Sequence, residues 1–249
     1  MTAETTKMSG GAAIVDALIR NGVDTVFGIP GVQLDPLFDA FHHAKNRIRV
    51  VHNRHEQGAG YMALGYAQAT GRVGTCVVVP GPGLLNAAAA ISTGYSLNSQ
   101  MLCIVGQIPS HLIGKGTGQL HELPDQLAIA EGLTKWAKRM DAPDDVPGTM
   151  AEAFRQLNTG RRRPVEVEMA LDIMKAESDV SPVDPPHDYD VLQPDPDRIE
   201  EVAKLLGEAE NPLIFAGGGA IDAGGPLLTL ADMLEAPVVM SSSALGDIT

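Results

Sequence analysis

The segment Val50-Val51-His52-Asn53-Arg54-His55-Glu56-Gln57-Gly58-Ala59-Gly60 decides the fold expected of this chain. Apolar residues enter the segment in a run typical of a buried strand, and small residues at helical spacing follow it. Glu56 therefore lies at a strand-to-helix turn, which is where parallel α/β sheets place their ligands. Two interpretations of this residue are open. It is either an ionised carboxylate stabilised by the helix N-terminus, or a buried carboxyl that hydrogen-bonds a bound ligand.

The same alternation of strand and helix continues on both sides of this segment. Apolar runs of strand length cover 23–29, 75–79, 101–108, 134–140 and 164–170, and helical patterns lie between them. Nearly continuous apolar strands that are separated by helices are typical of parallel sheets with both faces covered. The sequence therefore predicts the α/β class, with a doubly wound, mostly parallel sheet.

The composition changes after Lys175. Residues 177–196 hold five prolines and six acidic residues with little apolar periodicity, which is typical of an interdomain linker. A second, Rossmann-like α/β unit with two strands and two helices is expected over 197–249. Such a unit buries too little apolar surface to be stable alone, so we expect an incomplete domain there, after a first domain over 1–176.

Composition and charge restrict the classes of partner. With 249 residues, 44% of them hydrophobic and 20% charged, the chain is expected to be globular. The formal net charge of −13 disfavours nucleic acid and anionic membranes, because both bind basic surfaces. Cys76 and Cys103 lie inside apolar runs, which predicts buried, reduced thiols. No apolar run is long enough to span a membrane and the first eight residues lack a signal peptide's apolar centre, so we expect a cytoplasmic protein.

Three glycine-rich turns are candidates for ligand contacts. Gly28 to Gly31, Gly81 to Gly83 and Gly217 to Gly219 each follow a predicted strand and precede a helix. None matches the full dinucleotide-binding fingerprint, and glycine also serves any tight turn between strand and helix. The first two turns would lie with Glu56 at one edge of the first sheet, and this shared position is more informative than any single turn.

Several motifs of the first domain, in this order and at this spacing, carry a resemblance. They are Phe27-Gly28-Ile29-Pro30-Gly31, Arg54-His55-Glu56-Gln57-Gly58-Ala59, Gly65-Tyr66-Ala67 with Thr70-Gly71, Gly81-Pro82-Gly83 with Asn86, and Gly106-Gln107-Ile108-Pro109. Over residues 8–175 the chain resembles the pyrimidine-binding domain of thiamine-diphosphate enzymes, in particular acetolactate synthase and its carboligase and decarboxylase relatives. Residues 211–243 resemble the start of that family's central domain, where some members bind FAD.

The resemblance implies a catalytic role for Glu56. In the family, the glutamate at this place hydrogen-bonds N1′ of the cofactor's aminopyrimidine and favours its imino tautomer. This requires a carboxyl that shares a proton with a weakly basic nitrogen in a dry pocket. The family pattern also implies cofactor contacts from two turns and the helix that follows the second, namely at Pro30, Gly31, Val32, Gly81, Pro82 and Asn86. For Asn86, a helix-packing amide is the alternative.

His121 departs from the acetolactate synthase pattern. Those enzymes have Phe-Gln-Glu where this chain reads Leu120-His121-Glu122, and their glutamine faces the reacting carbon. Relatives that resemble pyruvate decarboxylase place a pair of histidines near this point. A neutral imidazole here would protonate a carbanionic intermediate or hold a substrate carboxylate, which makes His121 a candidate catalytic residue. The alternative is a histidine in a surface loop.

The family's diphosphate-binding motif is not found in this sequence. Members bind Mg²⁺ and the diphosphate through Gly-Asp-Gly followed by Asn in a further domain, whereas this chain has only Gly246-Asp247-Ile248. We therefore expect no metal ligands in 1–249, and Mg²⁺ bound through a missing domain or a partner. Since the family's cofactor lies between two chains, the resemblance implies a homodimer or homotetramer, or a separate diphosphate-domain subunit.

Three functions follow as hypotheses. The first is the N-terminal part of a thiamine-diphosphate-dependent carboligase or decarboxylase of 2-oxo acids, with acetolactate formation as the leading reaction and with the chain inactive alone. The second is the pyrimidine-domain subunit of a split enzyme. The third is a non-catalytic module that kept the fold. The sequence does not choose the 2-oxo acid.

Overall fold

The computed structural model describes residues 5–189 and 193–244, and the chain divides into two compact units, with the boundary after residue 191 of the sequence. The larger unit is built on a six-stranded, fully parallel sheet with the order β3-β2-β4-β5-β7-β6. Its strands are β2 (Thr25–Gly28), β3 (Arg49–His52), β4 (Gly74–Val78), β5 (Met101–Gln107), β6 (Trp136–Met140) and β7 (Val165–Ala170). The predicted doubly wound parallel sheet is confirmed.

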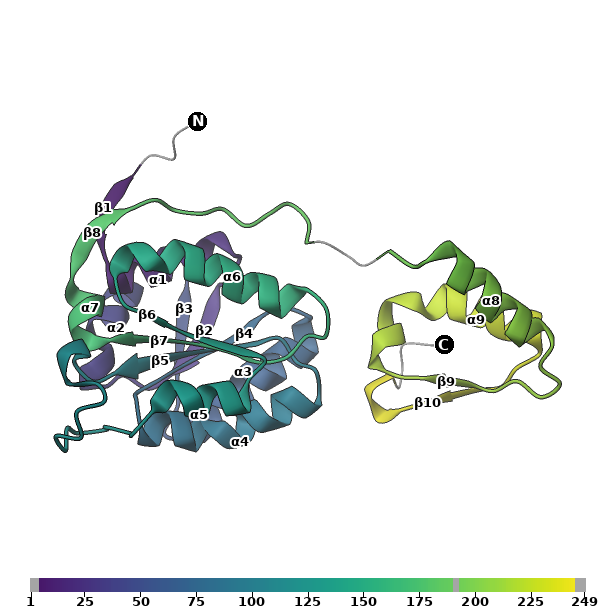
Figure 1. The fold of residues 1–249 in the computed structure, drawn as a ribbon, viewed down its shortest axis with the longest axis horizontal. Coiled ribbons are helices and arrows are strands. Elements are labelled where there is room, and N and C mark those ends of the chain that lie inside the picture. The colour runs from purple at the N-terminus through teal and green to yellow at the C-terminus, as the bar shows by residue number, and fades with distance from the viewer. Residues whose placement is uncertain (1–4, 190–192, 245–249) are drawn as a thin grey trace. The chain divides into compact units, whose positions relative to one another are not determined.

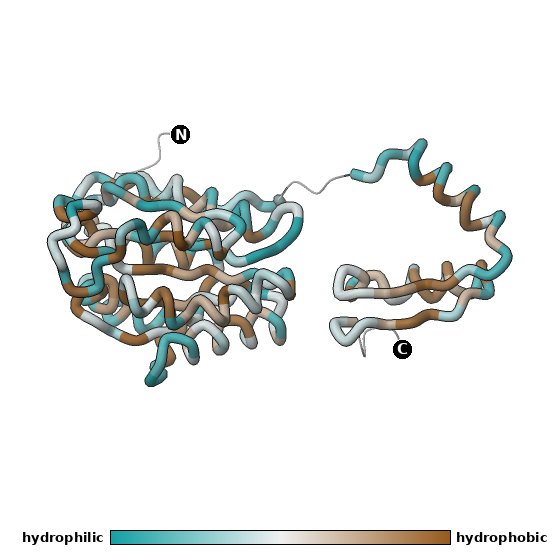
Figure 2. The backbone as a smooth tube through the Cα atoms, turned by 60° about the horizontal axis from the view of Figure 1, so that its bottom comes forward, coloured by the Kyte–Doolittle hydropathy of each residue, from teal (hydrophilic) through white to brown (hydrophobic). Residues whose placement is uncertain are grey.

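Helices cover both faces of this sheet (Figure 1). One face packs against α1 (Gly10–Arg20), α2 (Asp35–His43) and α6 (Val146–Asn158). The other face packs against α3 (Glu56–Thr70), α4 (Pro82–Ser96) and α5 (Gln126–Leu133). The strands run brown through the middle of the larger unit in Figure 2, as expected for strands that are apolar on both faces.

Alternate residues of the central strands supply the two cores. Val77, Leu102 and Ile104 point to the α1, α2 and α6 side, whereas Cys76 and Cys103 point to the α3, α4 and α5 side. Both cysteines are buried and free, as the sequence predicts. Burial of these strands on both faces explains why their sequence shows apolar runs and not strict alternation.

Local signals explain where the first helix begins and ends. The Ser9 hydroxyl accepts a hydrogen bond from the backbone N–H of Ala12 at 3.2 Å, which caps α1. At the other end, Asn21 is the C-cap and Gly22 takes φ +75°, a conformation that glycine adopts without strain. These two caps set the bounds of α1.

A second, smaller sheet corrects one part of the sequence analysis. Residues 177–180, assigned there to a linker, form β8 (Glu177–Val180), which pairs antiparallel with β1 (Thr6–Ser9). Strand β8 follows the short helix α7 (Leu171–Lys175) and extends the first unit. These two strands are only four residues long and lie far apart in the chain, so neither shows a readable period.

The smaller unit contains α8 (Pro196–Gly207), β9 (Ile214–Ala216), α9 (Gly224–Leu234) and β10 (Val238–Met240). Its two strands pair in parallel, with Phe215 beside Val239. Phe215 is 70% exposed and α8 has no buried residue, so much apolar surface of this unit is open to solvent in the part of the chain that is described.

Candidate active site

The strand order of the larger sheet reverses between β2 and β4. The chain leaves β2 for β3 on one side through α2, and α3 then returns it to β4 on the other side. In open α/β sheets, ligands bind at such a switch point, outside the carboxyl ends of the strands. The turns at Gly31 and Gly81 follow β2 and β4, and Glu56 follows β3, so three predicted site residues lie at this edge.

Glu56 is the first residue of α3. Its neighbour His55 is the N-cap, and the His55 ring nitrogen Nδ1 accepts a hydrogen bond from the backbone N–H of Gln57 at 3.2 Å. The half-buried Glu56 side chain reaches α4, where its Oε2 accepts a 3.0 Å hydrogen bond from the Asn86 side-chain amide. His55 therefore fixes the turn, and Asn86 fixes the carboxyl that the turn presents.

Gly81 occupies a position that only glycine fits. It takes φ +58°, which L side chains rarely adopt, and a Cβ there would lie 2.5 Å from the backbone oxygen of His121. Its backbone N–H donates a 2.8 Å hydrogen bond to Oε1 of Gln126. The turn before α4 is thus held closely against the loop that precedes α5.

The structure brings His121 against the Gly81 turn. His121 has φ +71°, uncommon for a residue with a side chain, and it is half-buried. Its Nδ1 is buried and has no hydrogen-bond partner among the described residues. The preceding residue, Leu120, is tied back through its carbonyl to the Gln33 side-chain amide at 3.4 Å. A strained backbone and an orphaned polar atom at the edge of the sheet are features of functional positions.

The other predicted contacts lie along the same edge. Pro30 and Pro82 are exposed, and Val32 is 64% exposed at the start of a short 3₁₀ helix (Val32–Leu34). The backbone of Gly31 packs closely against the Val79 side chain. These residues border the turn region without contacting Glu56 in any hydrogen bond that the structure describes. Their proposed roles stay predictions.

Sequence reasoning missed a buried polar network beneath Gly81. Besides accepting from Gly81, the Gln126 side chain donates to the Gly106 carbonyl at 3.0 Å and to Glu168 Oε2 at 2.7 Å. Glu168 in turn forms a 2.5 Å ion pair with Arg139. The available signal was the presence of charged residues inside otherwise apolar strands, because such groups are buried only with partners.

Glu166, two residues before Glu168, has no such partners. It is fully buried on the face of β7 that carries Glu168, it pairs in register with Cys103, and neither carboxyl oxygen has a hydrogen bond among the described residues. Burial, and next the charge of Glu168, raise the pKa of Glu166 well above its usual range.

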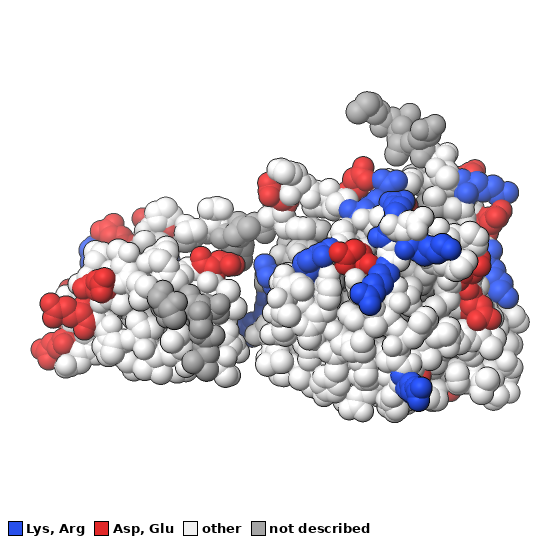
Figure 3. Space-filling model, turned by 180° about the vertical axis from the view of Figure 1, so that it is seen from behind, with Lys and Arg blue, Asp and Glu red and all other residues white. Residues whose placement is uncertain are grey.

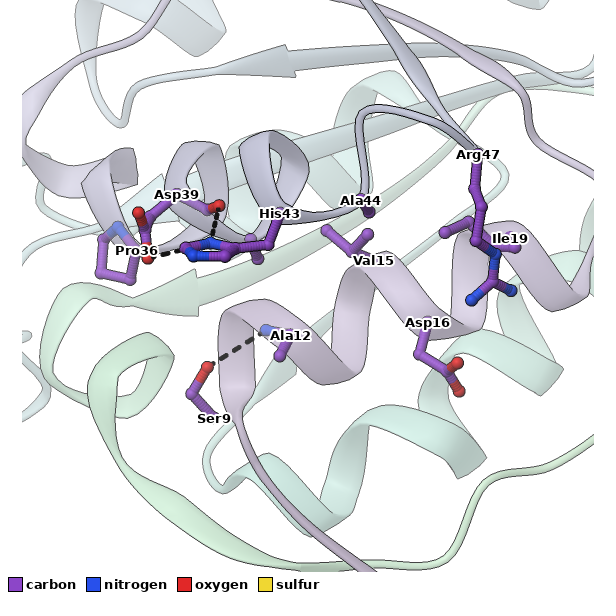
Figure 4. Close-up of a pocket in the computed structure, with 11 residues that line it drawn as sticks. Ser9, Ala12, Val15, Asp16, Ile19, Pro36, Asp39, His43, Ala44 and Arg47 are labelled. Carbon is purple, nitrogen blue, oxygen red and sulfur yellow. Dashed lines mark hydrogen bonds and ion pairs between the residues drawn. The ribbon is translucent and has the colours of Figure 1, made fainter.

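A surface pocket of about 360 Å³ lies away from these residues, between α1 and α2 (Figure 4). Small side chains leave room there, and Asp39 and His43 at one end and Asp16 and Arg47 at the other surround an apolar floor. Asp39 and His43 interact with each other, and Asp16 is paired with Arg20. None of the predicted site residues lines this pocket.

Charged side chains of both signs are interspersed over the upper part of the larger unit in Figure 3. Within residues 5–189 and 193–244, no helix is long and apolar enough to cross a membrane, and no three His, Cys, Asp or Glu side chains are grouped as a metal site. Residues 246–248, noted for the motif Gly-Asp-Ile, lie outside the described residues.

Comparison with known proteins agrees with this geometry. Residues 8–129 match the N-terminal TPP binding domain of thiamine pyrophosphate enzymes, and residues 199–249 match the central domain of the same enzymes. Across 96% of its length, the chain is 39% identical to the acetolactate synthase large subunit of Corynebacterium glutamicum. It is 37% identical to a probable 2-ketoarginine decarboxylase of Pseudomonas aeruginosa, again over 96% of its length.

A probable acetolactate synthase large subunit of Methanocaldococcus jannaschii is 36% identical over 96% of this chain. The chain spans about two-fifths of these relatives, covering 38%, 43% and 41% of their lengths. The matches to two consecutive domains, together with the parallel sheet and its glycine turns, lead to one conclusion. This chain belongs to the thiamine pyrophosphate enzyme family, of which it carries N-terminal and central-domain sequence.

Proposed function

We propose that this chain supplies the aminopyrimidine-binding part of an active site that uses thiamine diphosphate to decarboxylate a 2-oxo acid and to ligate the product to a second carbonyl compound. The observation that carries the proposal is the Glu56 carboxyl, held by Asn86 at the carboxyl edge of the sheet. Relatives named as acetolactate synthases and as a probable 2-ketoarginine decarboxylase support the reaction class.

The described residues fit an aminopyrimidine. Only Asn86 among them hydrogen-bonds the Glu56 carboxyl, which leaves the other oxygen for a ring nitrogen. The turn at Gly81 lets the backbone approach closely where a Cβ would clash, and the buried Nδ1 of His121 lacks a partner nearby. A polar, half-buried group and an orphaned nitrogen beside a close backbone approach are what a planar heterocycle with polar edges requires.

We assign a role in this chemistry to each residue of the candidate site. When bound, thiamine diphosphate supplies the carbon nucleophile and the electron sink for loss of CO₂. Glu56 shares a proton with the ring nitrogen of the aminopyrimidine, and Asn86 keeps that carboxyl in place. His121 holds or delivers a proton on the substrate side. Pro30, Gly31, Val32, Gly81 and Pro82 border the ring and exclude water from it.

Mg²⁺ and the diphosphate would be held, as the family resemblance implies, by a diphosphate-binding domain in a longer protein or in a partner subunit. FAD stays a prediction at residues 216–219, where β9 ends and a short 3₁₀ helix (Gly218–Ala223) begins. A split-enzyme subunit that works with a diphosphate-domain partner is the alternative arrangement of the same chemistry.

A second copy of the chain is the partner we propose. Helices α3 and α4 pack side by side, and Glu56 is the one charged residue in their two sequences. Tyr61, Met62 and Leu85 are between 37% and 47% exposed on these helices. A contiguous uncharged surface with exposed aromatic and aliphatic side chains is typical of a subunit interface.

The substitution Glu56→Gln in the complete enzyme tests the function. Gln keeps the length of the side chain but does not exchange a proton, so exchange of the cofactor C2 proton in D₂O should slow by about 100-fold or more, within the range of general acid–base catalysis. Circular dichroism and thermal unfolding should match the wild type. Unchanged C2 proton exchange in a folded, cofactor-bound variant would refute the role of Glu56.

A further inference from the structure

The side chain of Gln126 uses both of its N–H donors and its oxygen in hydrogen bonds inside the fold. It is 2% exposed and is the first residue of α5. Its oxygen accepts from Gly81, and its amide nitrogen donates to Gly106 and to Glu168. One side chain thus joins the turn after β4, the end region of β5 and the buried strand β7.

The orientation of this amide is determined by its neighbours. Glu168 Oε2 and the Gly106 carbonyl are both acceptors, so the NH₂ group of Gln126 must face them and its oxygen must face Gly81. Arg139 Nε donates to the other Glu168 oxygen at 2.5 Å, so Oε2 is left to accept from Gln126. The Arg139–Glu168 pair therefore orients the Gln126 amide, and this orientation places the Gln126 oxygen where it accepts from the Gly81 N–H.

Gln126 also links the two halves of the candidate site. On one side, Gly81 directly precedes α4, and α4 carries Asn86, which holds Glu56. On the other side, Gln126 follows His121 by five residues, and the His121 carbonyl lies against Gly81. A shift of the Gly81 turn would therefore move Asn86 and would also move the backbone against which His121 packs.

We infer that Gln126 is a positioning residue that keeps His121 and the Asn86–Glu56 pair in register through the Gly81 turn. The expected effect on turnover rests on the proposed function, whereas the placement of the Gly81 turn by Gln126 does not. Gln126 touches no reacting atom, and it acts through the N–H of Gly81. Mispositioning of catalytic groups by a fraction of an ångström to an ångström is sufficient to lower turnover substantially.

The first test is Gln126→Met in the 249-residue chain and in the complete enzyme. Methionine keeps the length of the side chain and removes its hydrogen bonds. In the isotope-labelled chain, the Gly81 amide and His121 ring resonances should both shift. In the complete enzyme, kcat should fall about 10- to 100-fold, while KM for the 2-oxo acid changes less than about threefold. Glu131→Met on the exposed surface of α5, the helix that Gln126 begins, is the matched control, with all four quantities unchanged.

The second test exchanges the charges. Gln126→Glu places two carboxylates side by side with no donor between them, so it should be more damaging than Gln126→Met. Adding Glu168→Gln restores a donor: the new amide at position 168 would donate to the new carboxylate at position 126, and its oxygen would accept from Arg139. The double variant should recover most of the activity lost in Gln126→Glu and return the Gly81 amide resonance toward its wild-type position.

The outcomes distinguish the positioning role of Gln126 from the proposed function. Unshifted Gly81 and His121 resonances in Gln126→Met would overturn the positioning role. The same holds if the activity lost equals the folded protein lost and the charge-exchanged double variant recovers none of it. If the wild-type enzyme turns over no 2-oxo acid, the proposed function fails, and the resonances still decide whether Gln126 positions the Gly81 turn.

Discussion

The Asn86 side-chain amide donates a 3.0 Å hydrogen bond to Glu56 Oε2 and so connects the start of α3 with the second turn of α4. The two residues come from different helices, and each follows a strand end at the same edge of the sheet. An amide donor leaves the carboxylate able to accept a second partner and restricts its rotamers. Asn86 therefore determines the position from which the Glu56 carboxyl can act.

We predict that Asn86→Ala weakens catalysis more than stability. The hydrogen bond is partly exposed, so its loss should cost only about 0.5–1.5 kcal/mol in the free energy of unfolding. Release of the Glu56 carboxyl should lower kcat by about tenfold or more. Urea unfolding and steady-state kinetics check the two parts, with Asn46→Ala, an exposed position after α2, as the surface control. Equal activity in both variants would contradict the prediction.

Much of the site could be predicted from the sequence, because the residues lie at the ends of readable elements. Glu56 and Gly81 each follow an apolar run and precede a helical pattern, so their shared edge follows from parallel topology. The hydrogen bond between Glu56 and Asn86 could not be predicted, because its geometry depends on how α3 packs against α4. The contacts of Gln126 join residues 20 to 45 positions away, which no local pattern reports.

The same limit applies to the fold. The central strands are identified by composition alone, because both their faces are buried. Strand β8 was missed because it is short and its partner β1 lies near the other end of the first unit. Its residues Glu177 and Asp179 are polar, as expected of an edge strand.

Gly81→Ala should destabilise the protein by about 1–3 kcal/mol, since it forces a side chain into a left-handed conformation and against the His121 carbonyl. Gly65→Ala is the matched control. Gly65 lies in the interior of α3, and a Cβ there meets no atom within 4 Å, so this change should stabilise by about 0.5–1 kcal/mol. Thermal and urea unfolding measure both. The same sign for the two substitutions would contradict the assigned conformation of Gly81.

Glu166 should make the protein less stable as the pH rises. Its raised folded-state pKa means that the folded protein binds more protons than the unfolded chain at pH values above the ordinary glutamate pKa of 4.5. The free energy of unfolding contributed by this group is therefore greatest below that pH and is lost progressively as the pH rises toward the folded pKa.

Glu166→Val, which has a similar volume, removes the unpartnered carboxyl. It should stabilise the protein at pH 7 by about 1–3 kcal/mol, and the advantage over wild type should grow as the pH is raised from about 5 to 7. Urea unfolding at several pH values tests this. The exposed Glu131→Val should show no pH-dependent gain. A constant difference between Glu166→Val and wild type across this range would show that the carboxyl does not titrate as argued.

Met62→Glu should separate two copies of the chain. Met62 is 37% exposed on the uncharged surface of α3 and α4, and a carboxylate buried there against its symmetry mate would face a like charge or an apolar surface. Sedimentation of the wild type should give a dimer and of the variant a monomer, with the same circular dichroism. Val183→Glu, an exposed apolar position after β8, is the control and should stay dimeric. A dimer that persists in Met62→Glu would place the subunit interface on another face, and a monomeric wild type would exclude self-association of this chain alone.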